Sequence, residues 1–281
     1  CEFDHADFFE SPSAYRRAFV NLVDQIPATG TLVIHTGIER WEELAGRCRG
    51  RVESFGLHAG QGGWRLMDVK ARSRGQEITW RAPDGRRGIL LLPLWGVHNA
   101  LNILAGLALS DVLGVEASVW ERASGTFTGV RRRLQCLGQR GDLLWVEDFA
   151  HHPTAVRSAV AAAREHRPHA GVHVIFEPGS ATLRMDALSG ALTEALAQAD
   201  RIWLYAPDTV SGRIRRLDPD RLVAELRGRG RDADLFRDSE SLWEAARELS
   251  GAQPETVLLL SNGRLGGLAG RVESAFGMMD G

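Results

Sequence analysis

The chain has 281 residues, of which 44% are hydrophobic and 25% are charged, and its formal net charge is −2. This balance indicates a folded globular protein with room for two ordinary domains, and it excludes a disordered chain. The near-neutral charge and the lack of a basic block give no reason to expect a nucleic acid or an anionic membrane as a partner.

Cysteine usage and the apolar runs point to the compartment. Cys1, Cys48 and Cys136 are odd in number and scattered, which indicates neither a disulfide framework nor a thiolate metal site. No apolar run approaches the roughly 18 residues of a membrane helix. Nothing at the N-terminus resembles a signal peptide. We therefore expect a cytoplasmic protein.

The first half of the chain combines helical and β patterns. In chain order, the apolar spacing predicts a helix over 13–26, a strand over 31–35, a helix near 40–46, strands over 51–55, 64–72, 76–81 and 88–94, and helices over 97–113 and 117–124. Pro27 and Gly114 stand where the first helix and the long apolar helix are expected to end.

From residue 131 onward, strands alternate with helices. The predicted order is a strand over 143–147, a helix over 153–166, a strand over 172–176, a helix over 187–199, a strand over 201–205, a helix over 219–227, a strand over 233–236, a helix over 239–249, a strand over 256–260 and a last helix after Gly266. This alternation predicts an α/β fold with a parallel, doubly wound sheet, whose ligands bind at the carboxyl ends of the strands. We expect the chemistry just after Glu147, Phe176, Tyr205 and Leu260.

The densest polar cluster after a predicted strand lies at residues 147–153 and contains Asp148, His151 and His152. An aspartate in this place can accept both hydroxyls of a ribose, and a helix that begins at Pro153 favours a nearby phosphate. The structural alternative is that Asp148 caps this helix and the histidines lie on the surface.

A second polar cluster opens the helix predicted over 97–113. His98 and Asn102 share one helix face, and Asn99 lies beside them. Asparagines in an apolar helix need hydrogen-bond partners, and one amide can present a donor and an acceptor to an adenine edge. The structural alternative is N-capping by His98 or Asn99 together with a hydrogen bond in the core.

Two further clusters are charged. The arginines at 131–133 lie where the two patterns join, so they are either a phosphate site or a solvated surface. Carboxylates at 2–7 surround His5, which makes this segment either a Mg²⁺ site or a frayed terminus. The glycine-rich residues 263–270 match no dinucleotide fingerprint, and the absence of such a fingerprint after any strand argues against a dinucleotide-dependent dehydrogenase.

The order of these motifs resembles the Mur ligase superfamily from residue 2 to about residue 270. The chain carries Asp-His, then Gly-x-His-Asn-x-x-Asn, then Phe-x-Gly-Val-x-Arg-Arg, then Glu-Asp-Phe-Ala-His-His-Pro. The resemblance implies the second half of a P-loop-type central ATPase domain over residues 1–130. It implies a Rossmann-like C-terminal domain over residues 131–281.

The resemblance also implies a role for each matching residue. His5 would bind Mg²⁺, and His151, Arg133 and Arg184 would be catalytic. The residues implied to bind ATP are His98, Asn99, Asn102, Arg132, Arg133 and Asp148. The residues implied to face the incoming peptide are Ser180, Thr182, Arg184 and Asn262.

Within the superfamily, His-His-Pro is similar to the bacterial branch that handles UDP-N-acetylmuramate. Residues 176–182 and 260–263 look like the tripeptide ligase of that branch, although Gly179 and Ala181 depart from its usual Arg and Asn. The implied reaction uses ATP and Mg²⁺ to convert the lactyl carboxylate into an acyl phosphate. The amine of L-Ala-γ-D-Glu-meso-diaminopimelate then attacks it, in peptidoglycan recycling.

The lysine content bears on this expectation. Of the 34 basic residues only Lys70 is a lysine, and it follows no glycine-rich loop. We therefore expect the P-loop upstream of residue 1 and no activity from this chain alone. The alternatives are the L-alanine-adding ligase of the same branch, or a protein that binds a nucleotide without catalysis.

Overall fold

The computed structural model describes residues 2–5, 8–60, 62–73, 75–179, 188–207 and 218–277. The chain forms two compact units, Cys1–Thr128 (unit 1) and Gly129–Gly281 (unit 2). This division falls two residues before the expected domain boundary between 130 and 131.

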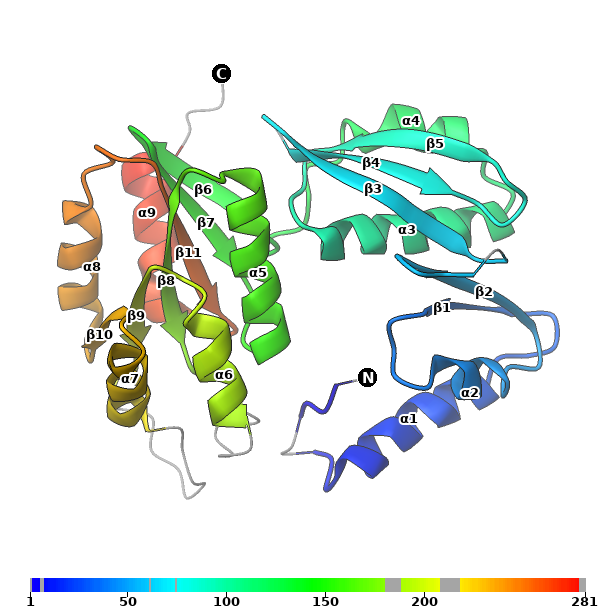
Figure 1. The fold of residues 1–281 in the computed structure, drawn as a ribbon, viewed down its shortest axis with the longest axis horizontal. Coiled ribbons are helices and arrows are strands. Elements are labelled where there is room, and N and C mark those ends of the chain that lie inside the picture. Colours follow the sequence, from blue (N-terminus) through cyan, green and yellow to red (C-terminus); the bar gives the residue numbers. More distant parts are fainter. Residues whose placement is uncertain are drawn as a thin grey trace. The chain divides into compact units, whose positions relative to one another are not determined.

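Unit 1 contains a mixed five-stranded sheet with the strand order β1-β2-β3-β4-β5 (Figure 1). Its strands are β1 (Thr31–His35), β2 (Arg51–Gly56), β3 (Trp64–Arg72), β4 (Gly75–Arg81) and β5 (Arg87–Leu92). Its helices are α1 (Pro12–Asp24), α2 (Trp41–Ala45), α3 (Val97–Val112) and α4 (Ala117–Ser124). The first three strands are parallel, and β3, β4 and β5 form an antiparallel meander.

The core of unit 1 lies between the meander and α3. Ile78 and Trp80 are two residues apart, so they lie on one face of β4, and both are almost completely buried. Helix α3 buries Ala100, Leu104 and Leu107, the spacing that places apolar side chains on one helical stripe. The apolar face predicted for residues 97–113 therefore packs against this sheet.

Unit 2 contains a six-stranded sheet with the order β10-β9-β8-β11-β7-β6. Its strands are β6 (Gln135–Arg140), β7 (Leu143–Asp148), β8 (Gly171–Glu177), β9 (Arg201–Tyr205), β10 (Asp232–Phe236) and β11 (Glu255–Ser261). Its helices are α5 (Pro153–His166), α6 (Ser189–Leu196), α7 (Pro219–Gly228), α8 (Ser239–Glu248), the short η3 (Leu265–Gly267) and α9 (Leu268–Phe276). All neighbouring strands are parallel except β6, which runs antiparallel to β7.

Helices cover both faces of this sheet. Trp145, Ile175 and Leu259 pack against α8 and α9 in one hydrophobic cluster. The alternate residues of the same strands face the other side, where α5 packs against α6 and α6 against α7 (Figure 1). Strand β11 therefore leads to a helix on one face, whereas β7 and β8 on either side of it lead to helices on the other face.

The expected α/β class and the doubly wound, mostly parallel sheet of unit 2 are confirmed. Strand β6 was not predicted, because a register shift between Cys136 and Gly138 interrupts its alternation and its last residues are polar. The predicted helix over 187–199 is shorter in the structure, which has α6 at Ser189–Leu196. The predicted strand over 88–94 begins and ends earlier, at Arg87–Leu92.

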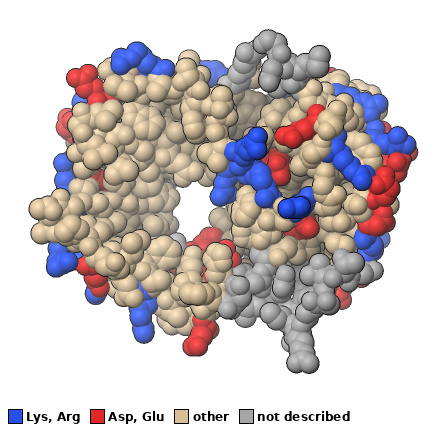
Figure 2. All heavy atoms as spheres, turned by 180° about the vertical axis from the view of Figure 1, so that it is seen from behind, with Lys and Arg blue, Asp and Glu red and all other residues tan. Residues whose placement is uncertain are grey.

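Charged side chains of both signs are interspersed on the surface. Figure 2 shows Lys and Arg next to Asp and Glu over the face that it draws. Many of them form exposed ion pairs, such as Arg47 with Asp24 and Arg237 with Asp220. Within the described residues, no helix is long and apolar enough to cross a membrane.

Candidate functional site

Asp148 lies at the carboxyl end of β7 with only 6% of its surface exposed. One carboxylate oxygen accepts the N–H of Ala150 at 2.8 Å, and the other accepts the N–H of Leu134 at 2.9 Å. Burial raises the pKa of Asp148, and these two N–H groups oppose the rise. Asp148 does not cap α5, whose N-cap is His152 without a side-chain cap bond, so the capping alternative is wrong.

His151 lies between Asp148 and the first turn of α5. Its Nδ1 is 3.0 Å from the carbonyl oxygen of Phe149, and its ring meets the Phe149 ring edge-on. Because a carbonyl oxygen only accepts, Nδ1 carries the proton of the neutral ring and Nε2 is the basic nitrogen. Beside it, α5 begins at Pro153 and runs for 14 residues, so its N-terminal N–H groups favour an anion at this position.

Arg132 and Arg133 have different surroundings. The Arg132 guanidinium donates to Glu147 at 3.0 Å and to the carbonyl oxygens of Ser261 and Gly263 at 2.5 and 2.8 Å. Arg133 is exposed, lies 5.5 Å from the centre of the Phe149 ring, and its guanidinium has no hydrogen bond to the residues that the structure describes. Arg132 therefore joins the ends of β7 and β11, whereas Arg133 is available to a ligand.

Burial also affects the carboxylate that Arg132 contacts. It raises the pKa of Glu147, while the charge of Arg132 and its hydrogen bond oppose that rise. The pair is partly buried, with 31% of the Arg132 side chain and 17% of the Glu147 side chain exposed. The interaction is therefore less screened than an exposed ion pair.

The loop after β11 is hydrogen-bonded to the end of β8. The Ser261 hydroxyl donates to the Glu177 carboxylate and accepts the N–H of Gly263 at 2.8 Å. The same carboxylate accepts the N–H of Leu265 at 2.8 Å. Asn262 is half-buried in this loop, next to Gly179. Ser180, Thr182 and Arg184 lie outside the described residues.

Sequence reasoning did not assign a role to Glu177 or Ser261. Both end buried strands, and they are partners in the β8–β11 register. The sequence therefore indicated only that each of these two residues lies at the end of a strand. Their pairing depends on β11 inserting between β8 and β7, which the order of the chain does not give.

The predicted adenine cluster lies in unit 1 on the first turns of α3. The Asn99 amide is buried and donates to the Trp95 carbonyl oxygen at 2.8 Å, which confirms the expected core hydrogen bond. The N-cap is Gly96, with φ of 83° and no side-chain cap bond, so N-capping by His98 or Asn99 is wrong. Asn102 is exposed and His98 is half-buried, so Asn102 has the amide that a ligand can reach most directly.

His5 lies in an exposed segment of unit 1. Its side chain is 68% exposed, and its Nε2 is 4.0 Å from an oxygen of Asp4. Over the described ranges, no group of three or more His, Cys, Asp or Glu side chains could hold a metal ion. Metal binding by His5 therefore stays a prediction.

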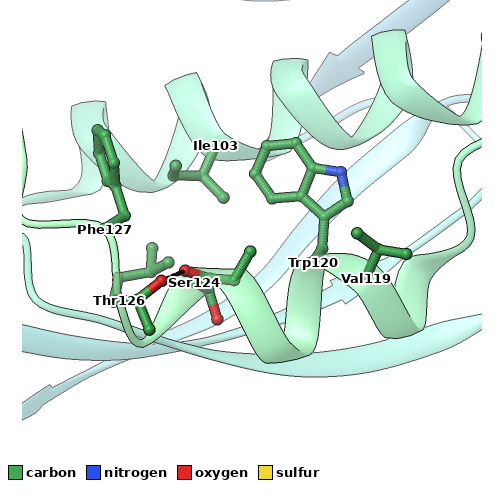
Figure 3. A pocket seen from close by; sticks show the side chains of 8 residues that line it. Ile103, Val119, Trp120, Ser124, Thr126 and Phe127 are labelled. Atoms are coloured by element: carbon green, nitrogen blue, oxygen red, sulfur yellow. Dashed lines mark hydrogen bonds between the residues drawn. The ribbon is translucent and has the colours of Figure 1, made fainter.

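Unit 1 also contains an apolar cavity of about 470 Å³ between α3, α4 and β5 (Figure 3). Ile103, Trp120 and Phe127 line it, and Figure 3 shows these side chains around the space. Its polar groups are satisfied locally, since the Ser124 and Thr126 hydroxyls donate to backbone carbonyls of α4. None of the residues that line the cavity is charged.

Two family descriptions match the chain, one after the other. The Mur ligase middle domain matches residues 2–110, and the glutamate ligase domain of Mur ligases matches residues 132–263. The chain belongs to the Mur ligase superfamily.

Similar proteins carry the names of two different Mur ligases. The chain is 32% identical to UDP-N-acetylmuramate–L-alanine ligase of Methylobacterium radiotolerans over 88% of its own length and 53% of that protein. It is 29% identical to UDP-N-acetylmuramate–L-alanyl-γ-D-glutamyl-meso-2,6-diaminoheptandioate ligase of Escherichia coli over 95% of its own length and 56% of that protein. This Mur ligase chain thus spans about half the length of the curated relatives it matches.

A solved structure supports the fold. UDP-N-acetylmuramate–alanine ligase of Thermotoga maritima superimposes with a TM-score of 0.73 and 24% identity, covering 96% of this chain and 56% of that one. The Mur ligase fold therefore extends over both units.

Proposed function

We propose that this Mur ligase chain supplies the C-terminal part of an ATP-dependent ligase that joins UDP-N-acetylmuramate to L-Ala-γ-D-Glu-meso-diaminopimelate. One observation carries the choice of acceptor. Residues 176–182 and 260–263 resemble the tripeptide ligase in sequence. Within them, Phe176 and Glu177 of β8 pair with Leu260 and Ser261 of β11, and a Ser261–Glu177 hydrogen bond joins the two strand ends. The relative from Escherichia coli, named for this acceptor, supports it.

The proposed reaction needs two bond-forming steps. A carboxylate oxygen of UDP-N-acetylmuramate attacks the γ-phosphorus of ATP, and ADP leaves. The peptide amine then attacks the acyl carbon, the carbon–oxygen bond to phosphate breaks, and the amine loses a proton. Both steps require the reacting groups to be held in the correct orientation. Side chains fixed at the carboxyl edge of the sheet are suited to this.

The residues of unit 2 suit the nucleotide end of this reaction. Each Asp148 oxygen accepts one backbone N–H, so the carboxylate keeps lone-pair positions for two ribose hydroxyls. Arg133 supplies an exposed guanidinium that matches phosphate oxygens. His151, with Nε2 as its basic nitrogen, lies beside the α5 N-terminus, where phosphate charge is favoured.

The second candidate is the L-alanine-adding ligase. The relatives from Methylobacterium radiotolerans and Thermotoga maritima carry that name. In this candidate the nucleotide site is unchanged, and the difference lies in the acceptor, which has one amino acid instead of three. The acceptor assay below distinguishes the two candidates.

We further propose that residues 1–281 alone do not turn over ATP. Lys70 is the sole lysine and lies in β3, not after a glycine-rich loop. A P-loop lysine reaches the β- and γ-phosphates, and no other residue in this chain fits that place. Phosphoryl transfer would then require a further segment of polypeptide.

The test uses protein expressed from the complete reading frame, assayed with UDP-N-acetylmuramate, ATP and Mg²⁺. Tripeptide and free L-alanine are offered separately, and ADP and amide product are both measured. We expect product with tripeptide only. Product with L-alanine only would favour the second candidate, and no product with either would refute ligase function.

Asp148→Ala tests the nucleotide site in the same assay. We expect product formation to fall sharply, because the variant removes the acceptor for ribose. The control is Asp142→Ala, which changes an exposed aspartate at the opposite end of β7. Equal losses in both variants would mean that Asp148 has no special role.

A further inference from the structure

Phe149 lies at the carboxyl edge of the unit 2 sheet, between two residues of the proposed nucleotide site. It directly follows Asp148 of β7 and comes two residues before His151, and it is half-buried. Its apolar side chain takes no part in the proposed bond-forming steps. Its ring nevertheless contacts three of the nitrogen-bearing side chains at this edge, which are Arg132, Arg133 and His151.

Two guanidinium groups lie over the Phe149 ring. The guanidinium carbon of Arg132 is 4.9 Å from the ring centre, and that of Arg133 is 5.5 Å from it. Both distances lie within the roughly 6 Å over which an aromatic face attracts a cation. Because the two groups carry the same charge, their attraction to one ring opposes the repulsion between them. The ring therefore allows two arginines to share this place.

The two arginines depend on the ring to different degrees. Arg132 is also held by Glu147 and by the carbonyl oxygens of Ser261 and Gly263. The Arg133 guanidinium has no such hydrogen bond to the described residues, so its contact with the ring matters more. Burial raises the pKa of Asp148, and the charge of Arg133 is one of the influences that oppose this rise. Arg133 is therefore close enough to the Asp148 carboxylate to act on it.

The backbone around Arg133 has an unusual conformation. Arg132 and Leu134 have positive φ angles of 58° and 49°, which residues other than glycine rarely adopt. The Leu134 N–H donates to Asp148 at 2.9 Å, and the Phe149 N–H donates to the Arg132 carbonyl oxygen at 2.8 Å. Backbone strain of this kind persists where the surroundings enforce it, and it is concentrated at functional sites. The turn and the ring together determine where the Arg133 guanidinium lies.

We propose that Phe149 is a positioning residue of the nucleotide site, whose ring holds the Arg133 guanidinium in place for the phosphates of ATP. A guanidinium binds phosphate oxygens best through two parallel hydrogen bonds, which require one orientation of its plane. Phe149 also holds His151, whose Nδ1 lies 3.0 Å from the Phe149 carbonyl oxygen. The inference rests on the proposed ligase function but not on which acceptor is used.

The experiment compares Phe149→Leu with Phe149→Tyr in the protein from the complete reading frame. Leucine keeps an apolar side chain without an aromatic face, and tyrosine restores that face. We expect Phe149→Leu to raise the Kd for ATP about fivefold, the effect of losing one cation–π contact. Phe149→Tyr should stay within about twofold of the unmodified protein, and the Kd for UDP-N-acetylmuramate should be unchanged in both variants.

Arg133→Ala completes a double-mutant cycle. If the ring acts through Arg133, Phe149→Leu should have no further effect on the Kd for ATP in the Arg133→Ala background. The matched control is Phe236→Leu. Phe236 is a half-buried phenylalanine that ends β10 and packs on Trp203, and the structure places no described arginine over its ring. Its replacement removes a ring from another strand end and should leave the Kd for ATP unchanged.

Two outcomes would overturn the inference. The same Kd for ATP in Phe149→Leu and in the unmodified protein would show that Arg133 does not need the ring. Additive effects of Phe149→Leu and Arg133→Ala would show that Phe149 acts on the nucleotide without Arg133. Failure of the ligase proposal is distinguishable from both, because it is the lack of amide product from the unmodified protein, measured separately from ATP binding.

Discussion

Arg132 and Arg133 are neighbours in the chain but differ in what their side chains contact. Arg132 donates to one carboxylate and two carbonyl oxygens, so truncating it would leave three acceptors without their donor. We expect Arg132→Ala to lower the free energy of unfolding of unit 2 by about 2–3 kcal/mol. Arg133→Ala should change it by less than about 0.5 kcal/mol.

Chemical denaturation of the two variants checks this difference in stability. In a nucleotide-binding assay with the complete protein, we expect the opposite order, with Arg133→Ala having the clearer effect. There we expect Arg133→Ala to fold normally and bind ATP more weakly. Equal stability of both variants would contradict the contacts of Arg132.

His173 is a second residue whose surroundings decide its chemistry. It is completely buried in β8, and within the described part of the chain neither ring nitrogen has a hydrogen-bond partner. Its Nδ1 lies 3.6 Å from a Glu255 oxygen, which is too long for a hydrogen bond. Burial, with a smaller contribution from the charge of Arg201, lowers the pKa of His173 from 6.5 to about 3. The folded protein therefore keeps this imidazole neutral.

This lowered pKa predicts acid sensitivity. Between about pH 6.5 and pH 3 the unfolded chain binds a proton at His173 that the folded chain does not. The free energy of unfolding should therefore fall as the pH falls, by up to about 1.4 kcal/mol per pH unit from this group. His173→Leu should remove that part of the slope. At pH 8 it should be no less stable than the unmodified protein, since it removes two unsatisfied nitrogens. Denaturation curves measured from pH 8 to pH 4 compare the variant with the unmodified protein. The same pH dependence of the free energy of unfolding in both proteins would contradict the prediction.

At the scale of elements, β6 shows how a strand can depend on a distant helix. Gly138 lies at the register shift of β6, and a Cβ atom there would collide with backbone atoms of Phe276 and Gly277 at the end of α9. The Phe276 ring also stacks on Trp145 of β7, so α9 cannot move away without losing that contact. The glycine is therefore required by the packing of α9 on the sheet.

Gly138→Ala tests this packing. Because the colliding atoms are backbone, we expect the variant to lower the free energy of unfolding of unit 2 by about 1–3 kcal/mol. Gly228→Ala is the control, because a Cβ at that position in α7 meets no atom within 4 Å. Thermal unfolding followed by circular dichroism separates the two, and a neutral Gly138→Ala variant would show that α9 adjusts.

At the scale of the whole molecule, each unit contains its own hydrophobic cluster. One cluster is built from residues between Val33 and Trp120, and another from residues between Leu137 and Phe276. Because these clusters do not share residues, we expect a chain of residues 129–281 to fold by itself. Its unfolding should be cooperative and should match one transition of the 281-residue chain in midpoint. A chain without a cooperative transition would contradict this expectation.

Periodicity and local motifs determined much of this protein before its structure was considered. Apolar spacing indicated most helices and strands within a few residues, because one buried face repeats along each element. Motif order indicated the Mur ligase superfamily, which two matching domain descriptions support. Asp148 was singled out because it ends a predicted strand, where ligands of such sheets bind, whereas Asn262 was singled out by its motif alone.

The tertiary structure alone decided which strand ends meet. Strand β11 comes last in the chain but lies between β8 and β7, and this insertion pairs Ser261 with Glu177 and brings Arg132 to the same loop. The separate roles of Arg132 and Arg133 and the neutral state of His173 depend on partners more than 80 residues away or on burial. Such contacts are set by the packing of non-neighbouring elements, which local periodicity does not encode.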